Sequence, residues 1–333
     1  MTNIDTHVTL ATYSQSVEAP VSNPAIPPLS RHKHKKKLNS KSGARRRHHI
    51  LVYTGLILAA AIAVFPLLFM VSSSLKADDQ QIFADLASWR AFFPVGELTL
   101  DNYAGVNDRV PAVRFFINSI IVTLAIVLLG LFVNSLIGFA IARIRFRGSK
   151  FVLSLVLATL MVPFETIAVP MIYWVSKLPT ISWAKDGFLL SQGMLNTYQV
   201  QILPFVANAL AIFLFVQQFK TIPKEFDEAA KVDGASWFTI YLKIIVPMSK
   251  STFATVAIIL MLPAWNSYLW PLMAVQQEDL RPVSVGMQYF FQLNPEWGQI
   301  MAYATLITLP MLILFVIFQK AFVTSLASSG VKG

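Results

Sequence analysis

The chain has 333 residues, 55% of them hydrophobic and only 13% charged, whereas an ordinary soluble domain carries about 25% charged residues. Together with a mean hydropathy of +0.59, this composition excludes a typical soluble protein and indicates one embedded in a membrane. The sequence contains no cysteine, which excludes disulfides, thiolate metal sites and cysteine nucleophiles.

The positive charge is concentrated before the first apolar run, with nine Lys and Arg between Arg31 and Arg47. A basic block at this position acts as a topology signal and contacts anionic lipid. We therefore expect membrane lipid, and no nucleic acid, as its partner. All five histidines also precede residue 50, so the membrane segments have none to serve as a base or ligand, and we predict no metal site.

Six apolar runs have the roughly 20 residues that a transmembrane helix needs. We predict an all-α membrane protein with six transmembrane helices over 50–322, preceded by a disordered basic tail (1–49) and followed by a C-terminal tail (323–333). The six predicted spans are 50–74, 115–142, 151–176, 199–219, 252–275 and 300–322.

Prolines interrupt five of these six runs. Kinks of this kind are tolerated where neighbouring helices or a water-filled cavity satisfy the freed carbonyl groups. Their number favours a bundle that lines a pathway over a set of plain anchors.

Loop charge predicts the orientation. The loop after the second span carries four cations and no acid over 143–150, and five lysines lie between Lys220 and Lys250. The long 76–113 loop instead carries six acids against three cations. The positive-inside rule therefore predicts that both termini lie in the cytoplasm and that 76–113 lies outside.

The loop between the fourth and fifth spans is the most informative segment. Pro223 suits a first helical turn, and the acids Glu225, Asp227 and Glu228 follow in that turn, where the helix dipole favours them. Gly234 permits a sharp turn, and a second amphipathic stretch, 237–246, ends at Pro247. We predict two short helices joined at a glycine. They are either a docking protrusion or a surface loop without a partner.

The spacing of this loop favours the docking role. Glu228, Ala229 and Ala230 are followed after three residues by Gly234, and after nine more by 244–247, Ile-Ile-Val-Pro. This pattern closely resembles the EAA loop of binding-protein-dependent ABC importers, with Val246 where leucine is usual. Asn118, Asn208, the 163–170 stretch and 265–272 extend the resemblance, over 50–322, to the MalG-like permeases of carbohydrate importers.

The resemblance implies a type I ABC importer permease fold in the cytoplasmic (inner) membrane. It implies four kinds of partner: a homologous MalF-like permease, two ATPase subunits, an extracytoplasmic solute-binding protein and a small-molecule solute. The EAA loop (221–250), called the elbow below, would then sit in a cleft of the ATPase. The residues expected to couple it to the ATPase are Glu225, Asp227, Glu228, Ala229, Ala230, Asp233 and Gly234.

We expect no cofactor on this chain and no enzymatic activity of its own. The sequence has no Walker A pattern, so ATP and Mg would belong to the partner ATPase subunits. The connection at 177–198 is longer than the resemblance leads one to expect, and its role is open.

Uncharged polar and aromatic residues in the spans suit hydroxyl-rich solutes, because amides bond hydroxyls and rings pack on C–H surface. Each Asn can instead form an interhelical hydrogen bond, and Trp265 can be an interfacial anchor. Glu165 either faces the pathway or caps a broken helix between Pro163 and Pro170. The candidates are Asn118, Asn134, Glu165, Asn208, Trp265, Asn266 and Tyr268.

These observations predict a permease subunit that imports a sugar or sugar-like solute such as an oligosaccharide, a glycoside or a polyol osmolyte. A secondary transporter or channel would need paired intramembrane charges, and a membrane enzyme would need a convergent catalytic set. Neither is visible in the sequence. Importers of amino acids or polyamines would favour charged residues in the pathway.

Overall fold

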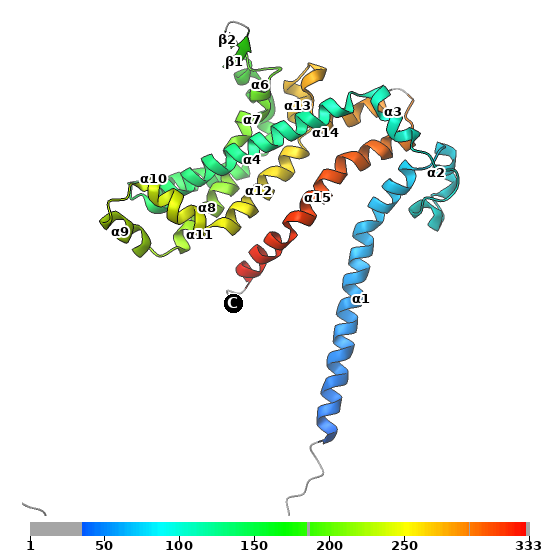
Figure 1. The fold of residues 1–333 in the computed structure, drawn as a ribbon, viewed down its shortest axis with the longest axis horizontal. Coiled ribbons are helices and arrows are strands. Elements are labelled where there is room, and N and C mark those ends of the chain that lie inside the picture. The colour runs from blue at the N-terminus through cyan, green and yellow to red at the C-terminus, as the bar shows by residue number, and fades with distance from the viewer. Residues whose placement is uncertain (1–34, 185–186, 293, 331–333) are drawn as a thin grey trace, which may run out of the picture. The chain divides into compact units, whose positions relative to one another are not determined.

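A computed structural model describes residues 35–184, 187–292 and 294–330. The chain divides into two units, Met1–Ala61 and Ile62–Gly333, and each is described by itself. The described residues are mostly helical, with one β-hairpin and several loops (Figure 1). The α-helices are α1 (Lys35–Ser74), α2 (Asp79–Asp85), α3 (Asp101–Arg109), α4 (Ala112–Arg143), α5 (Ser149–Ala158), α6 (Phe164–Val175), α7 (Tyr198–Val206), α8 (Ala209–Thr221), α9 (Glu225–Val232), α10 (Trp237–Ile240), α11 (Val246–Met248), α12 (Lys250–Trp265), α13 (Leu269–Ala274), α14 (Val283–Gly286) and α15 (Trp297–Gly330).

Shorter elements connect these helices. Strands β1 (Pro179–Ala184) and β2 (Gly187–Gln192) pair antiparallel, so the long 177–198 connection contains a hairpin. A π-helical segment, η3 (Tyr241–Ile245), joins α10 to α11. The 3₁₀ helices are η1 (Trp89–Phe92), η2 (Thr159–Met161), η4 (Glu278–Leu280) and η5 (Met287–Phe291).

The membrane spans largely match the apolar runs. Within the described residues, three unbroken helices are long and apolar enough to cross a membrane: His48–Ser74, Ala112–Arg143 and Trp297–Ile317. Three further pairs qualify if each bent pair is one span, which gives up to six. The pairs are bent by 103° between 149–161 and 164–175, by 41° between 198–206 and 209–221, and by 84° between 237–248 and 250–265.

Three boundaries differ from the sequence-based expectation. The predicted fifth span, 252–275, is not one helix, because α12 ends at Trp265 and α13 begins at Leu269. Helix α1 begins at Lys35, so 35–49 is helical where we predicted disorder, and residues 1–34 lie outside the described part of the chain. Helix α15 likewise continues to Gly330, past the predicted start of the C-terminal tail.

Helix α4 is the centre of the bundle. Its 32 residues span about 48 Å at 1.5 Å per residue, and it packs on α7, α8 and α12 (Figure 1). A Cβ at Gly138 would come within 2.6 Å of the Cβ of Phe215, so this position lets α4 and α8 approach closely. Small residues play this role between helices in membranes, where hydrophobic association is weak.

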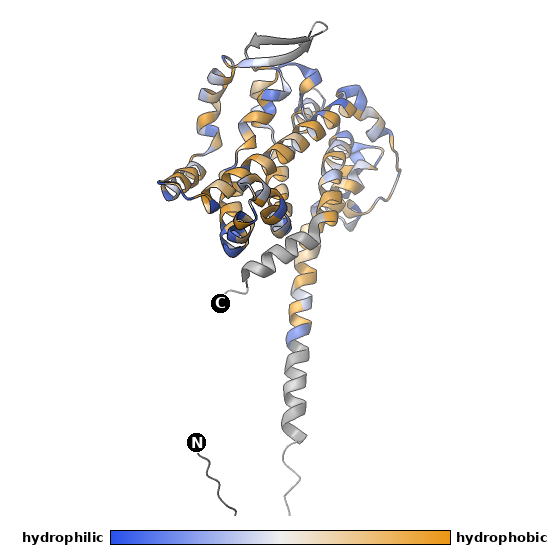
Figure 2. Ribbon diagram, turned by 60° about the vertical axis from the view of Figure 1, so that its left-hand side comes forward, coloured by the Kyte–Doolittle hydropathy of each residue, from blue (hydrophilic) through white to orange (hydrophobic). Residues whose placement is uncertain are grey.

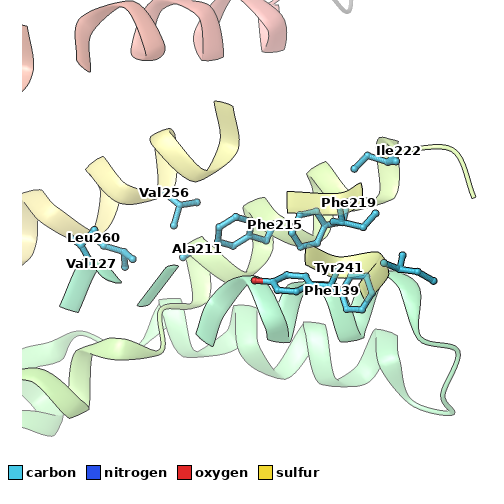
Figure 3. Close-up of a cluster of buried hydrophobic side chains, with 11 residues drawn as sticks. Val127, Phe139, Ala211, Phe215, Phe219, Ile222, Tyr241, Val256 and Leu260 are labelled. Carbon is cyan, nitrogen blue, oxygen red and sulfur yellow. The ribbon is translucent and has the colours of Figure 1, made fainter. Parts of the chain in front are cut away.

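The main core lies beside this contact. Phe139, Phe215, Phe219 and Tyr241 gather between α4, α8 and η3 (Figure 3). The rings of Phe215 and Phe219 stack with centroids 5.5 Å apart, and those of Phe139 and Tyr241 lie 5.4 Å apart. The second half of the elbow is thus anchored in the bundle by burial of aromatic surface.

The opposite end of α4 meets the 75–111 connection. There Lys76, whose side chain is fully buried, donates to Asp85 at 2.9 Å, and Asp79 accepts hydrogen bonds from the backbone N–H groups of Trp297 and Gly298 at the start of α15. A carboxylate at a helix N-terminus satisfies unpaired donors and the helix dipole. Figure 2 shows hydrophobic residues along the bundle helices and hydrophilic residues gathered toward their ends.

Candidate functional site

Three helix breaks meet at one cavity of about 390 Å³, called the membrane cavity below. Phe164 follows the α5–α6 break, Ala207 and Asn208 form the α7–α8 break, and Ser267 and Tyr268 lie in the α12–α13 break. Unbroken α4 closes the cavity with Ser119, Val122 and Ile126. Broken helices at membrane depth are tolerated where they line a cavity, and such breaks commonly form the solute sites of transporters.

The described lining of the membrane cavity contains no Asp, Glu, Lys, Arg or His. One wall is aromatic: the rings of Phe164, Phe205 and Trp270 have centroids 5.6 to 6.0 Å apart. Polar groups come from Ser119, Gln201, Asn208, Ser267 and Tyr268. The cavity is therefore apolar and aromatic with a few uncharged polar groups, as expected of a site for a small neutral ligand.

Asn134 of α4 stabilises the α7–α8 break. Its Nδ2 donates to the carbonyl of Val206 at 2.8 Å, and its Oδ1 accepts from the backbone N–H of Asn208 at 2.8 Å. The Oδ1 of Asn208 in turn accepts from the N–H of Ala211 and caps α8. The side chain of Asn134 thus pairs backbone groups that the break would otherwise leave unsatisfied.

Asn208 also has an amide nitrogen that the cap does not use. Its Oδ1 is used by Ala211, but its Nδ2 has no hydrogen-bond partner among the described residues, and the residue lines the membrane cavity. An unpaired amide donor at a cavity wall suits a ligand hydroxyl.

The buried Gln201 is a residue that the sequence-based reasoning missed. It is 2% exposed, lines the same cavity and donates from Nε2 to the carbonyl of Leu280, while its Oε1 has no partner among the residues that the structure describes. In the sequence it was one polar residue inside an apolar run, with no local signal to distinguish it.

The other candidates do not join this cavity. Asn118 is fully buried: its amide donates to the carbonyls of Asp279 and Arg281 and accepts from the hydroxyl of Tyr198. This is the structural hydrogen bonding considered as its alternative. Glu165 is exposed in the first turn of α6, immediately after the break. This is the position expected if Glu165 caps a broken helix.

Trp265 and Asn266 are close to Tyr268 in sequence but face elsewhere. Trp265 is 3% exposed, donates from Nε1 to the carbonyl of Ile307 and belongs to the buried cluster that includes Phe115 and Phe290. Asn266 is exposed, and its amide Nδ2 donates a hydrogen bond to the carbonyl of Leu262. Helix α12 ends at Trp265, and the change of backbone direction there lets Tyr268 line the membrane cavity.

At the other end of α4, the elbow forms as two helical pieces. Helix α9 carries Glu225, Asp227 and Glu228 in its first turn, and Gly234 follows with φ of +80°, which confirms the predicted glycine turn. The second piece continues to Met248, past the end predicted at Pro247, because Pro247 occupies the first turn of α11, where its missing N–H is harmless.

A buried ion pair joins α4 to the elbow. Arg143, the last residue of α4, lies 3.2 Å from Asp227 (Nη1 to Oδ2) and donates to the carbonyl of Ile222 at 2.8 Å. Burial raises the pKa of the Asp227 carboxyl, and the Arg143 guanidinium opposes that rise. The sequence-based interpretation counted Arg143 only as a topology charge and Asp227 only as a helix-dipole acid, so the pair was missed.

The remaining coupling candidates point outward. Glu225, Glu228, Ala229, Asp233 and Gly234 are exposed and Ala230 is half-buried. The apolar side chains of Val232 (89% exposed) and Phe226 (46% exposed) accompany them. Helix α9 thus presents a face of acids and uncovered apolar groups, which is the composition of a docking surface.

A bundle with a break-lined cavity and a projecting elbow defines a membrane transport subunit, a permease. The chain belongs to the family of binding-protein-dependent transport system inner membrane components, whose model matches residues 126–328.

Relatives cover most of the chain. It is 31% identical to the arabinooligosaccharide transport permease AraQ of Halalkalibacterium halodurans, over 85% of this chain and 96% of the relative. It is 33% identical to the lactose permease LacG of Rhizobium radiobacter, over 86% and 97%. It is 30% identical to the trehalose/maltose permease MalG of Thermococcus litoralis, over 85% and 97%.

Solved structures have the same fold. A bacterial ABC transporter involved in the import of the acidic polysaccharide alginate matches with a TM-score of 0.67 at 20% identity, over 89% of this chain and 99% of that chain. The fold is therefore that of a type I ABC importer permease, as predicted from the sequence.

Proposed function

We propose that this chain is the permease subunit of an ATP-driven importer for a neutral sugar or sugar-like solute. The observation that carries the proposal is the meeting of three helix breaks, α5–α6, α7–α8 and α12–α13, at a cavity whose described lining has no Asp, Glu, Lys, Arg or His. Uncharged donors and aromatic rings suit hydroxyl-rich rings. Relatives named as arabinooligosaccharide, lactose and trehalose/maltose permeases support the same class of solute.

The assembly we propose has the chain beside a second, MalF-like permease in the cytoplasmic membrane, with both termini in the cytoplasm. Two ATPase subunits hold the ATP and Mg, one of them binds the elbow of this chain, and an extracytoplasmic solute-binding protein delivers the sugar. The exposed acids and apolar groups of α9 support the elbow as the ATPase-binding surface. Alternating access then follows from rigid-body movement of the bundle when the ATPases close.

An ion-coupled transporter is the competing function. It needs paired charges at the coupling site. The ion pairs of the described residues involve Lys76, Asp85, Arg90, Arg109, Glu296, Arg143 and Asp227. None of these residues lines the membrane cavity.

Reconstitution tests the proposal. The chain is assembled in proteoliposomes with a MalF-like permease, the ATPase and the solute-binding protein, and uptake of lactose, trehalose, maltose and arabinooligosaccharides is measured with and without ATP. We expect uptake of at least one sugar that requires both ATP and the ATPase. Sugar uptake that continues without either contradicts the proposal, as does a complex that transports only charged solutes.

A further inference from the structure

A second pocket of about 340 Å³ lies next to the membrane cavity, lined by Tyr268, Ser284, Met287, Gln288 and Phe291. We call it the outer pocket. Most of its lining comes from α14 and η5, in the connection before α15, which belongs to the end of the bundle opposite the elbow. Tyr268 is the one residue that lines both spaces.

Tyr268 is held loosely between two fixed neighbours. Trp265 and Trp270 are 3% and 1% exposed, and each donates its indole N–H to a backbone carbonyl. Tyr268 is 42% exposed, and its hydroxyl lies 3.5 Å from the Oε1 of Gln288, beyond the usual distance for an O–H···O bond. Its ring can therefore rotate without breaking a strong interaction, while the backbone on either side stays in place.

We propose that Tyr268 is the gate between the outer pocket and the membrane cavity, and that a neutral sugar ring is what passes it. In the structure the phenol lies between the two spaces, near Gln288. Rotation of the ring away from Gln288 joins them into one route from the far end of the bundle to Asn208.

The chemistry along this route supports an uncharged, hydroxyl-bearing solute. The described linings of both spaces contain no Asp, Glu, Lys, Arg or His. A passing ring meets first Gln288 in the outer pocket, then Tyr268, which lines both spaces, and then Asn208 and the aromatic residues of the membrane cavity. The inference that the solute is a sugar rests on the proposed function. The inference that Tyr268 is a gate rests only on the position of Tyr268 in the lining of both pockets.

The natural absence of cysteine gives a clean background for the test. Ser267→Cys places a thiol of nearly the same size in the membrane cavity. Met287→Cys places one in the outer pocket and is the matched control. Each is made in the full chain within its assembled transporter, and a membrane-impermeant charged maleimide is added to the side opposite the elbow. The labelling rate of this chain is followed by gel shift.

A gate that is open for about a tenth of the time slows labelling behind it about tenfold. Adding Tyr268→Ala should therefore raise the labelling rate of Ser267→Cys on the order of tenfold and leave that of Met287→Cys unchanged. Tyr268→Phe keeps the ring and should keep the slow rate. Equal rates with and without Tyr268→Ala, or an equal rise at both cysteines, would overturn the gate.

The solute is tested separately with lactose and trehalose, together with the binding protein. Slower labelling of Ser267→Cys in the Tyr268→Ala background when sugar is present supports a sugar in the cavity. A raised labelling rate in a transporter that moves no sugar would keep the gate and reject the proposed function. Normal sugar uptake with no effect of Tyr268→Ala on labelling would keep the function and reject the gate.

Discussion

Arg143 and Asp227 form a buried ion pair, 3.2 Å from Nη1 to Oδ2, that joins the end of α4 to the first turn of α9. The two side chains are 1% and 9% exposed, and Arg143 Nε and Asp227 Oδ1 have no hydrogen-bond partner within the described part of the chain. Since the same α4 also lines the membrane cavity, the pair connects the exposed half of the elbow directly to the helix that forms the cavity wall.

Removing one partner of this pair should destabilise the protein strongly. Asp227→Leu leaves the Arg143 charge buried without its counter-ion, for which we expect a loss of about 3–5 kcal/mol. The double variant Arg143→Met with Asp227→Leu should recover most of that loss, because apolar replacements of a buried pair are often neutral. Thermal unfolding of the purified chain in detergent measures both.

The exposed Asp233→Asn is the control and should unfold like the parent chain. Measuring uptake distinguishes an effect on stability from an effect on coupling to the ATPase. The double variant should fold and still transport poorly, because apolar packing alone does not fix the orientation of α9 relative to α4. A double variant with full ATP-driven uptake would show that the pair only stabilises the fold.

Glu228→Lys should abolish ATP-driven uptake and leave membrane insertion intact. Glu228 is exposed on α9, so reversal of its charge removes an attraction to the ATPase without burying anything. ATPase co-purification and uptake are measured together. Lys150→Glu, a charge reversal at an exposed site in α5, is the control and should retain both. Normal uptake by Glu228→Lys would count against the docking role.

Asn134→Leu should damage the α7–α8 break. It removes the partners of the Val206 carbonyl and the Asn208 N–H, and each buried group left unpaired costs about 1–3 kcal/mol. Asn208→Ser retains a capping oxygen and should lose only a few tenths of a kcal/mol of helix stability. Unfolding temperatures of the two variants compare the effects, and equal values would mean that the break needs no support from α4.

Trp265→Ala should impair assembly, not solute selection. The indole is buried and bonded to the Ile307 carbonyl, so its truncation should cost about 3–5 kcal/mol. Trp265→Phe keeps most of the packing and should recover much of the expression level. If Trp265→Ala assembles normally and changes which sugars are taken up, the residue contacts solute after all.

The spans and the elbow were predictable because their signals are local. Hydropathy over about 20 residues marks a membrane helix, and the acids of α9 with Gly234 mark a helix start and a turn within a few positions. The same locality explains the errors. Pro263 and Pro271 indicated a kink in the 252–275 run, but they did not locate the break after Trp265, so Trp265, Asn266 and Tyr268 were all taken as pathway candidates on one span.

The cavity itself depends on contacts between distant segments. Asn134 supports a break that Ala207 and Asn208 form, and Gln201 reaches the carbonyl of Leu280. Arg143 pairs with an acid from another helix, where loop statistics record only its charge. Polar side chains of this kind are rare in membrane helices, so the sequence marks them as candidates. Their roles depend on the distant segments that they contact, and only the structure shows those contacts.

Helix α4 bonds to the elbow through Arg143 and to the opposite connection through Asn118, so the two water-facing ends share one rigid support. Mutations at the two ends should then interact genetically, so that a change at one end can compensate for a defect at the other. Suppressors of an elbow mutation should arise among the buried polar positions of α4, and some should also rescue defects at the Asp279–Arg281 turn.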